Sequence, residues 1–149
     1  MPRWRGFDTP FGDIATQLDG IIIDANIANK ANKMTWVYTS QDANRYADSL
    51  NNSYKLVGYG IPKKGFIKSF DLGESANIIP NTVGGDGTKY ICDYYFIEET
   101  NYQLRTVIVG GDANSGANAG LMCFISQFTH KIQSSDIGFR TVSDFIPKK

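Results

Sequence analysis

RTVIVGGDANSGANAGLMCF, residues 105–124, and DIGFRTV, residues 136–142, carry the strongest structural signal in this chain. A first apolar run ends at a Gly-Gly pair, and a polar loop leads into a second apolar run. Another polar loop, Gln127–Ser135, precedes the third run. Short apolar runs bounded by glycine and polar residues are typical of β-strands. The pattern therefore predicts three strands of one antiparallel sheet, at 105–109, 119–125 and 137–142.

Four glycines in this region indicate special backbone positions. Glycine is the residue that tolerates tight bends and close approach of another chain segment. We therefore expect one of these two features at Gly110, Gly111, Gly116 and Gly120.

The preceding sequence predicts two short helices and further strands. Thr9-Pro10 is a helix start signal, and Phe11, Ile14 and Leu18 follow at helical spacing, which predicts a helix over 10–19. Ser40 indicates a second, shorter helix over Asp42–Asp48. Apolar runs predict strands at 21–23, 34–38, 54–57, 66–70, 78–79 and 90–97, with a turn-rich loop over 80–87. These elements together predict an α+β domain.

The faces of these elements predict which side chains form the core. The expected buried set contains the apolar residues that recur on one side of each element. Its members are Ile14, Leu18, Ile22, Trp36, Val107, Val109, Leu121, Phe124 and Phe139.

Length and charge limit the function classes. The 149 residues suit a single domain spanning 1–149. Fifteen Lys and Arg residues balance fifteen Asp and Glu residues, which argues against nucleic acid as a partner. No apolar run approaches the roughly 20 residues of a membrane span, so we expect no membrane insertion.

Signatures of catalysis or metal binding are weak. His130 stands alone, and Cys92 and Cys123 lack the spacing of a zinc site. We expect both cysteines to be small buried thiols. No nucleophile motif or phosphate-binding loop is evident, and no two carboxylates are singled out as a glycosidase pair. The sequence thus predicts no enzyme activity, no cofactor and no metal ion.

The C-terminal pattern resembles a known fold. A Gly-Gly turn, a polar excursion and a final Gly-Phe-Arg strand occur in the C-type-lectin-like fold shared by formylglycine-generating enzymes and the variable proteins of diversity-generating retroelements. Gly110-Gly111 and Gly138–Arg140 stand in those places, and Asn114–Leu121 is similar to a segment of the retroelement and phage versions. The resemblance implies short helices, a twisted antiparallel sheet and long irregular loops.

The N-terminal segment extends the resemblance to virion structural proteins of gut bacteriophages, including the crAss-like group that infects Bacteroidales. Arg3–Phe7, Pro10–Ile14 and Leu18–Ile21 are similar to a segment of those proteins, although Ala15 replaces their usual tryptophan. Formylglycine generation needs a closely spaced cysteine pair and copper, and Cys92 and Cys123 stand in motifs that do not match. The resemblance therefore implies binding rather than catalysis.

Such domains present variable side chains on loops. In this chain the polar stretches 112–115 and 126–135 stand in their place, and we expect the ligand to contact residues 112–115 and 126–133. Phe128 is the expected aromatic anchor, exposed together with Ile132, unless both pack against a neighbouring chain of a homotrimer. His130 would make binding sensitive to pH near its ordinary pKa of about 6.5. The candidate ligand-binding residues are Asp112, Asn114, Ser115, Gln127, Phe128, His130, Lys131 and Gln133.

The function implied is a receptor-binding or adhesion domain on the virion surface, at the tip of a tail or head fibre. Its partners would be a glycan or protein of the host cell surface and other virion proteins. One alternative is a purely structural virion subunit, such as a head-fibre, capsid-decoration or collar protein. A second alternative is a variable protein of a diversity-generating retroelement.

Overall fold

The computed structural model describes residues 3–4, 7–8, 12–73, 78–99 and 103–138. Of the described structure, 43% is strand and 10% is helical. The 3-10 turns are η1 (Ile27–Asn29), η2 (Ala43–Arg45) and η3 (Ala113–Asn118). The strands are β1 (Arg3–Trp4), β2 (Phe7–Asp8), β3 (Ala15–Asp24), β4 (Thr35–Thr39), β5 (Lys55–Gly60), β6 (Gly65–Leu72), β7 (Ile78–Val83), β8 (Tyr94–Phe96), β9 (Leu104–Val109), β10 (Phe124–Ile125) and β11 (Ile137–Gly138).

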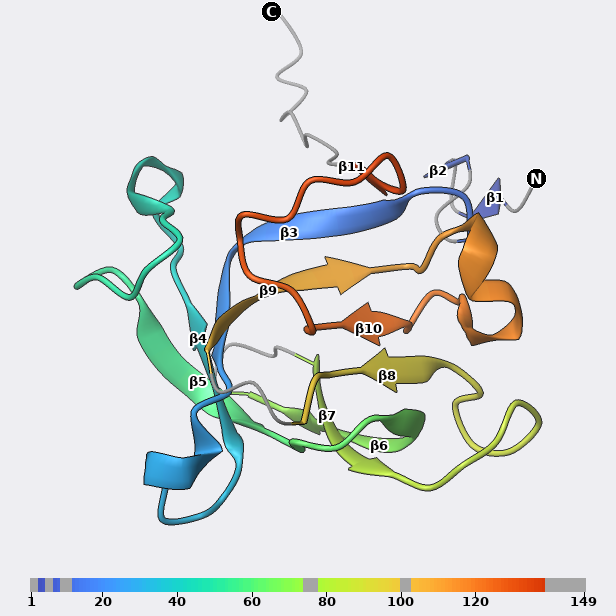
Figure 1. The fold of residues 1–149 in the computed structure, drawn as a ribbon, viewed down its shortest axis with the longest axis horizontal. Helices are drawn as coiled ribbons and strands as arrows, with labels where there is room; N and C mark the ends of the chain where they lie inside the picture. The colour runs from blue at the N-terminus through green and yellow to red at the C-terminus, as the bar shows by residue number, and fades with distance from the viewer. Residues whose placement is uncertain (1–2, 5–6, 9–11, 74–77, 100–102, 139–149) are drawn as a thin grey trace, which may run out of the picture.

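The strands form one strongly curved sheet (Figure 1). Apart from the β1–β2 pair, the described strands belong to a nine-stranded sheet of order β5-β4-β3-β9-β10-β8-β6-β7, with β11 paired to β3. Its two ends meet, because the Ile61 N–H after β5 donates a hydrogen bond to the Pro80 carbonyl of β7 at 3.1 Å. The sheet is therefore a nearly closed barrel.

A bend in β3 contributes to this curvature. Leu18 pairs with Val107 of β9 and Ile23 pairs with Arg105, so β3 carries extra residues between the two pairs. Gly20 lies within this bulge with φ of 77°. Its carbonyl accepts a hydrogen bond from the Ser40 N–H at 2.8 Å. Bulges of this kind bend a strand and increase its twist, and here the bend lets β3 pair with β9 and β4 in turn.

Alternate residues of the strands fill the barrel interior. One buried cluster takes a residue from each of five strands: Ile23, Val37, Val57, Ile79 and Val107. A second cluster contains Ile67, Tyr95 and Ile97. Phe124 of β10 packs against both clusters and so joins them into one core.

The opposite face of β3, β9 and β10 is also apolar. Ala15, Ile108, Cys123 and Ile125 are buried there, and Phe96, Phe128, Ile132 and Ile137 pack against them. Three of these covering residues come from the segment 126–137, which leaves β10 and returns to pair β11 with β3. The Thr106 N–H donates to the Phe128 carbonyl at 2.9 Å and so ties this segment to β9. The barrel thus has a second, outer core.

The predicted α+β, C-type-lectin-like fold is wrong, because the chain forms a β-barrel. The predicted helix over 10–19 is replaced from Ala15 onward by β3, and residues 10 and 11 lie outside the described residues. The helical spacing of Ile14 and Leu18 is overridden because β3 has partner strands on both sides. The predicted helix over 42–48 is only η2, in which the Asp42 side chain accepts from the Asn44 N–H at 3.1 Å.

Most predicted strands are confirmed in place, and two are shorter than expected. Runs 21–23, 34–38, 54–57, 66–70, 78–79 and 105–109 overlap β3, β4, β5, β6, β7 and β9. The predicted loop over 80–87 is partly wrong, since β7 continues to Val83. Run 90–97 shortens to β8 and run 119–125 to β10. Ile137–Gly138 does join the sheet, while residues 139–142 lie outside the described residues.

The carboxylate of Asp93 explains why the strand predicted from 119 starts only at Phe124. It accepts a hydrogen bond from the Met122 N–H at 2.6 Å, which holds residues 120–123 in a turn. A Cβ on Gly120 would lie 2.0 Å from Asp93 Oδ1, so this glycine is required for a close approach. Gly110, Gly111 and Gly116 have φ of 90°, 66° and 53°. The special backbone positions expected at these four glycines are therefore confirmed.

The predicted core is partly correct. Ile22 and Val107 are fully buried, as expected. Leu18, Trp36, Val109 and Phe124 are half-buried. The prediction is wrong for Ile14 and Leu121, whose surfaces are 47% and 44% exposed. Ile14 precedes β3, and Leu121 lies in the 120–123 turn. Phe139 lies outside the described residues.

Gly20→Ala should destabilise the barrel by about 1–3 kcal/mol, because an alanine must adopt a positive φ. Its Cβ would also lie 2.6 Å from the Tyr46 ring. Urea unfolding measures the change. Gly87→Ala is the matched control, because its Cβ meets nothing closer than 3.9 Å. Equal stability of the two variants would contradict the role given to the β3 bend.

Candidate functional site

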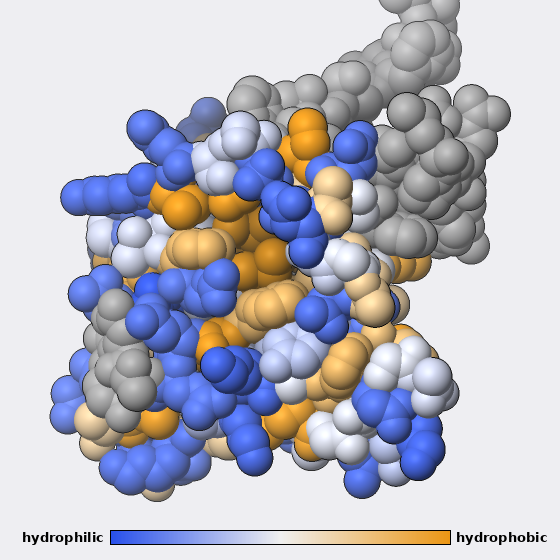
Figure 2. All heavy atoms as spheres, turned by 45° about the vertical axis from the view of Figure 1, so that its right-hand side comes forward, coloured by the Kyte–Doolittle hydropathy of each residue, from blue (hydrophilic) through white to orange (hydrophobic). Residues whose placement is uncertain are grey.

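A groove runs along the outer face of the barrel between β8 and the segment that follows β10. It has a volume of about 670 Å³ and is lined by Lys64, Tyr94, Phe96, Ile97, Glu98, Glu99, Gln127 and Phe128. In Figure 2, hydrophobic side chains gather in a hollow near the middle of the molecular face, with hydrophilic residues around it. The groove therefore combines an apolar surface with polar margins.

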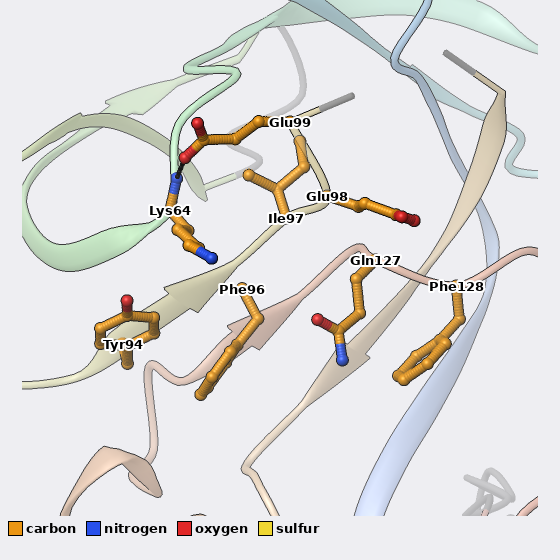
Figure 3. Close-up of a pocket in the computed structure, with 8 residues that line it drawn as sticks. All are labelled: Lys64, Tyr94, Phe96, Ile97, Glu98, Glu99, Gln127 and Phe128. Carbon is orange, nitrogen blue, oxygen red and sulfur yellow. Dashed lines mark hydrogen bonds between the residues drawn. The ribbon is translucent and has the colours of Figure 1, made fainter. Parts of the chain in front are cut away.

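Aromatic side chains form one surface of the groove. Tyr94 and Phe96 are two residues apart on β8, so they project from the same side of the strand. Their ring centroids are 4.5 Å apart, and Phe66 packs edge-on against Tyr94 at 5.0 Å. Figure 3 shows the Gln127 side chain between the rings of Phe96 and Phe128. An amide thus stands within an aromatic row.

A buried arginine connects the two walls of the groove. Arg105 of β9 is 2% exposed. One of its terminal nitrogens donates to the Gln127 carbonyl at 2.6 Å, and the other lies 3.3 Å from Glu98 Oε2. Because the guanidinium is planar and rigid, these contacts fix the spacing between the end of β8 and the chain after β10.

The polar margin of the groove is tied to the loop after β5. The Lys64 N–H donates to Glu99 Oε1 at 3.2 Å, as the dashed line in Figure 3 marks. The Glu98 and Glu99 side chains point away from each other in that view. The two carboxylates therefore border the groove at separate places.

A second hollow adjoins the groove. It has a volume of about 390 Å³ and shares Phe96, Gln127 and Phe128 with the first. Its remaining lining residues come from β9, β10, the predicted loop 112–115 and the segment 126–137: Ile108, Asp112, Ser115, Ile125, Ile132, Gln133, Ser134, Asp136 and Ile137. The structure thus brings the two predicted loops together at one hollow.

Two of the predicted ligand-binding residues serve the structure of their own loop. Asp112 caps η3: its Oδ1 accepts from the Ser115 N–H and from the Ser115 hydroxyl, each at 2.8 Å. The Ser115 hydroxyl in turn accepts from the Asp112 N–H at 3.2 Å. Both residues line the second hollow, but their mutual hydrogen bonds occupy much of their bonding capacity.

The other predicted residues divide into two groups. Gln127 and Phe128 line both hollows, and Gln133 lines the second. Phe128 and Ile132 are half-buried against the outer core, so neither is as exposed as we expected. Asn114 and Lys131 are exposed and line neither hollow.

His130 also lines neither hollow, and its ring faces the Ile21 carbonyl of β3. Burial lowers the pKa of His130 below its ordinary value of 6.5, and this effect outweighs the nearby carboxylates of Asp48 and Asp19. The histidine therefore belongs to the packing between segment 126–137 and β3.

Neither cysteine is part of a disulfide. Cys123 is buried, as predicted, and burial raises the pKa of its thiol to about 12, with help from Asp93 and Asp112. Cys92 is only half-buried. Among the described residues there is no group of three His, Cys, Asp or Glu side chains placed to hold a metal ion. No helix in the described part of the chain is long and apolar enough to span a membrane.

Several lining residues were missed by sequence reasoning: Lys64, Tyr94, Phe96, Glu98 and Glu99. The sequence of Tyr94–Phe96 could have indicated two of them. Alternating residues of a strand face opposite sides, and Tyr95 is fully buried. Two aromatic residues flanking a core position therefore had to lie on the outer face.

The pKa of His130 leads to a pH-dependent stability. A base whose folded pKa lies below its unfolded value of about 6.5 takes up protons more readily in the unfolded chain. The stability that the neutral His130 ring contributes is therefore complete above the unfolded pKa, and it is lost as the pH falls through the lower, folded pKa. Melting temperatures at about pH 7.5 and 5.5 should differ more for the natural chain than for His130→Gln. Equal differences would contradict this role of His130.

No protein-family model matches the chain, and neither a curated protein nor a solved structure matches it. The resemblance to phage virion proteins thus stays a prediction, and the groove is the feature from which a function can be argued.

Proposed function

We propose that this chain is a non-enzymatic binding domain that recognises a glycan through the groove between β8 and the segment after β10. The observation that carries the proposal is the row Tyr94, Phe96 and Phe128, with the Gln127 amide among the rings. An open groove of about 670 Å³ is in the range of small-molecule sites.

The chemistry of the groove suits sugars. An aromatic ring offers a rigid apolar surface on which the apolar face of a sugar ring can stack. An amide supplies both donors and an acceptor, which match the hydroxyl groups of a sugar. Gln127 is well placed for this because Arg105 holds its backbone carbonyl at 2.6 Å and leaves the side chain directed at the groove.

The arrangement of carboxylates supports binding over hydrolysis. Glycosidases place two carboxyl groups on either side of the scissile bond. In this groove Glu98 and Glu99 point away from each other, and each has a partner in the protein. The proposal therefore includes no catalytic step.

The biological setting rests on the sequence resemblance alone. An adhesion domain on a virion surface would bind a glycan of the host cell surface. The alternative of a structural subunit is favoured by one observation, the exposed apolar side chains of Tyr59, Leu72 and Ile78 on β5, β6 and β7, which are 44%, 75% and 46% exposed. Such residues are typical of a face that packs on a neighbouring subunit.

Tyr94→Ala should weaken glycan binding at least about tenfold, because it removes a stacking surface. Tyr59→Ala is the matched control on another face of the barrel and should leave glycan binding unchanged. A glycan array with the full chain identifies the ligand, and calorimetry then measures the affinity of each variant. Melting temperatures show that both variants remain folded.

Absence of binding to every glycan on the array would reject the proposed function. So would equal affinity of the Tyr94→Ala and natural chains. A self-association that only Tyr59→Ala weakens, without any glycan binding, would favour the structural subunit.

A further inference from the structure

The two hollows of the outer face share their central residues, and this continuity limits the shape of the ligand. Phe96, Gln127 and Phe128 line the hollow of about 670 Å³ and also the hollow of about 390 Å³. A ligand that contacts this shared ridge can therefore extend to both sides. The lining of the first hollow includes Glu98, Glu99 and Lys64, and that of the second includes Asp112 and Asp136.

The second hollow, like the first, combines an apolar surface with polar side chains, although its own apolar residues are aliphatic rather than aromatic. Its floor is the outer core, with Ile108 and Ile125 of β9 and β10. Its margin carries Gln133, Ser134 and Asp136, which supply hydrogen-bonding groups at the edge of an apolar surface. Two adjoining hollows that each place hydrogen-bonding groups beside an apolar surface suit a ligand whose units repeat.

The charges on the lining are unequal. Glu98, Glu99, Asp112 and Asp136 line the two hollows, whereas Lys64 is the basic side chain among the lining residues that the structure describes. The ion pair of Arg105 with Glu98 offsets both of these charges, so the acidic excess comes from Glu99, Asp112 and Asp136 against Lys64. Like charges brought together across an interface cost binding free energy. Acidic ligands are therefore disfavoured.

We infer that the ligand is a non-anionic oligosaccharide chain of two or more units that lies across Phe96, Gln127 and Phe128 and fills both hollows. This inference rests on the proposed function and adds the length and the charge of the ligand. Sulfated, sialylated and uronic-acid glycans are disfavoured by the carboxylates that line the two hollows. Neutral chains and chains of amino sugars fit.

The test compares neutral oligosaccharides of one to six units with uronic-acid chains of the same lengths, using calorimetry on the full chain. Affinity for the neutral series should rise by at least about tenfold from one unit to three or four, as the second hollow fills. The acidic series should bind at least about tenfold more weakly at each length, and added salt should reduce this difference.

A substitution at the second hollow tests the same point. Gln133→Arg places a long side chain at the margin of that hollow and should remove most of the gain in affinity with length. Gln103→Arg is the matched control, because Gln103 is exposed and lies just before β9, outside both hollows. It introduces the same charge and should keep the full dependence on length.

The outcomes separate this inference from the proposed function. Glycan binding that does not depend on length, or that favours the acidic series, overturns the inference and leaves the glycan-binding function standing. The same holds if Gln133→Arg and Gln103→Arg behave alike. Absence of binding by any neutral or acidic chain overturns both.

Discussion

The bend in β3 is the constraint on which the rest of the structure depends. A straight strand of this length would hold β4 and β9 in one flat sheet and leave the ends of the sheet apart. Because the chain bulges between Leu18 and Ile23, β3 turns as it passes Gly20. β5 and β7 can then approach each other through the Ile61–Pro80 hydrogen bond. Closure buries a core to which five strands each contribute one residue, so the barrel and its stability follow from the bend.

The outer core follows from the same strands. A strand in a closed barrel still has an outward face, and on β3, β9 and β10 that face carries Ala15, Ile108 and Ile125. These apolar side chains require a cover, and the segment 126–137 supplies it. The cover stops short of β8, so Tyr94 and Phe96 remain at its edge. The groove is therefore the gap between a strand and the segment that covers its neighbours, with Arg105 holding the two at a fixed distance.

Sequence reasoning located most strands, because short apolar runs between glycines and polar residues report strand formation directly. It failed where local and long-range signals disagree. The spacing of Ile14 and Leu18 suits a helix, yet pairing on both sides makes 15–24 a strand. The site was found in part: Gln127, Phe128 and Gln133 were predicted, while Tyr94 and Phe96 come from a predicted strand to which no ligand-binding role was given. A sequence does not show which outward face stays uncovered, since this depends on where a distant segment lies.

The difference between the predicted loops and the observed groove has a physical basis. Asp112, Ser115 and His130 are polar residues in loops, which makes them natural candidates for ligand contact. Asp112 and Ser115 instead hydrogen-bond to each other, and His130 packs toward the Ile21 carbonyl of β3. Loops of this polarity need such bonds to keep one conformation. The side chains left to meet a ligand are those held by rigid neighbours, such as Tyr94 on β8 and Gln127 beside Arg105. A site built on strands and a buried arginine loses little freedom on binding, and this preorganisation favours the groove over the loop tips as the place of recognition.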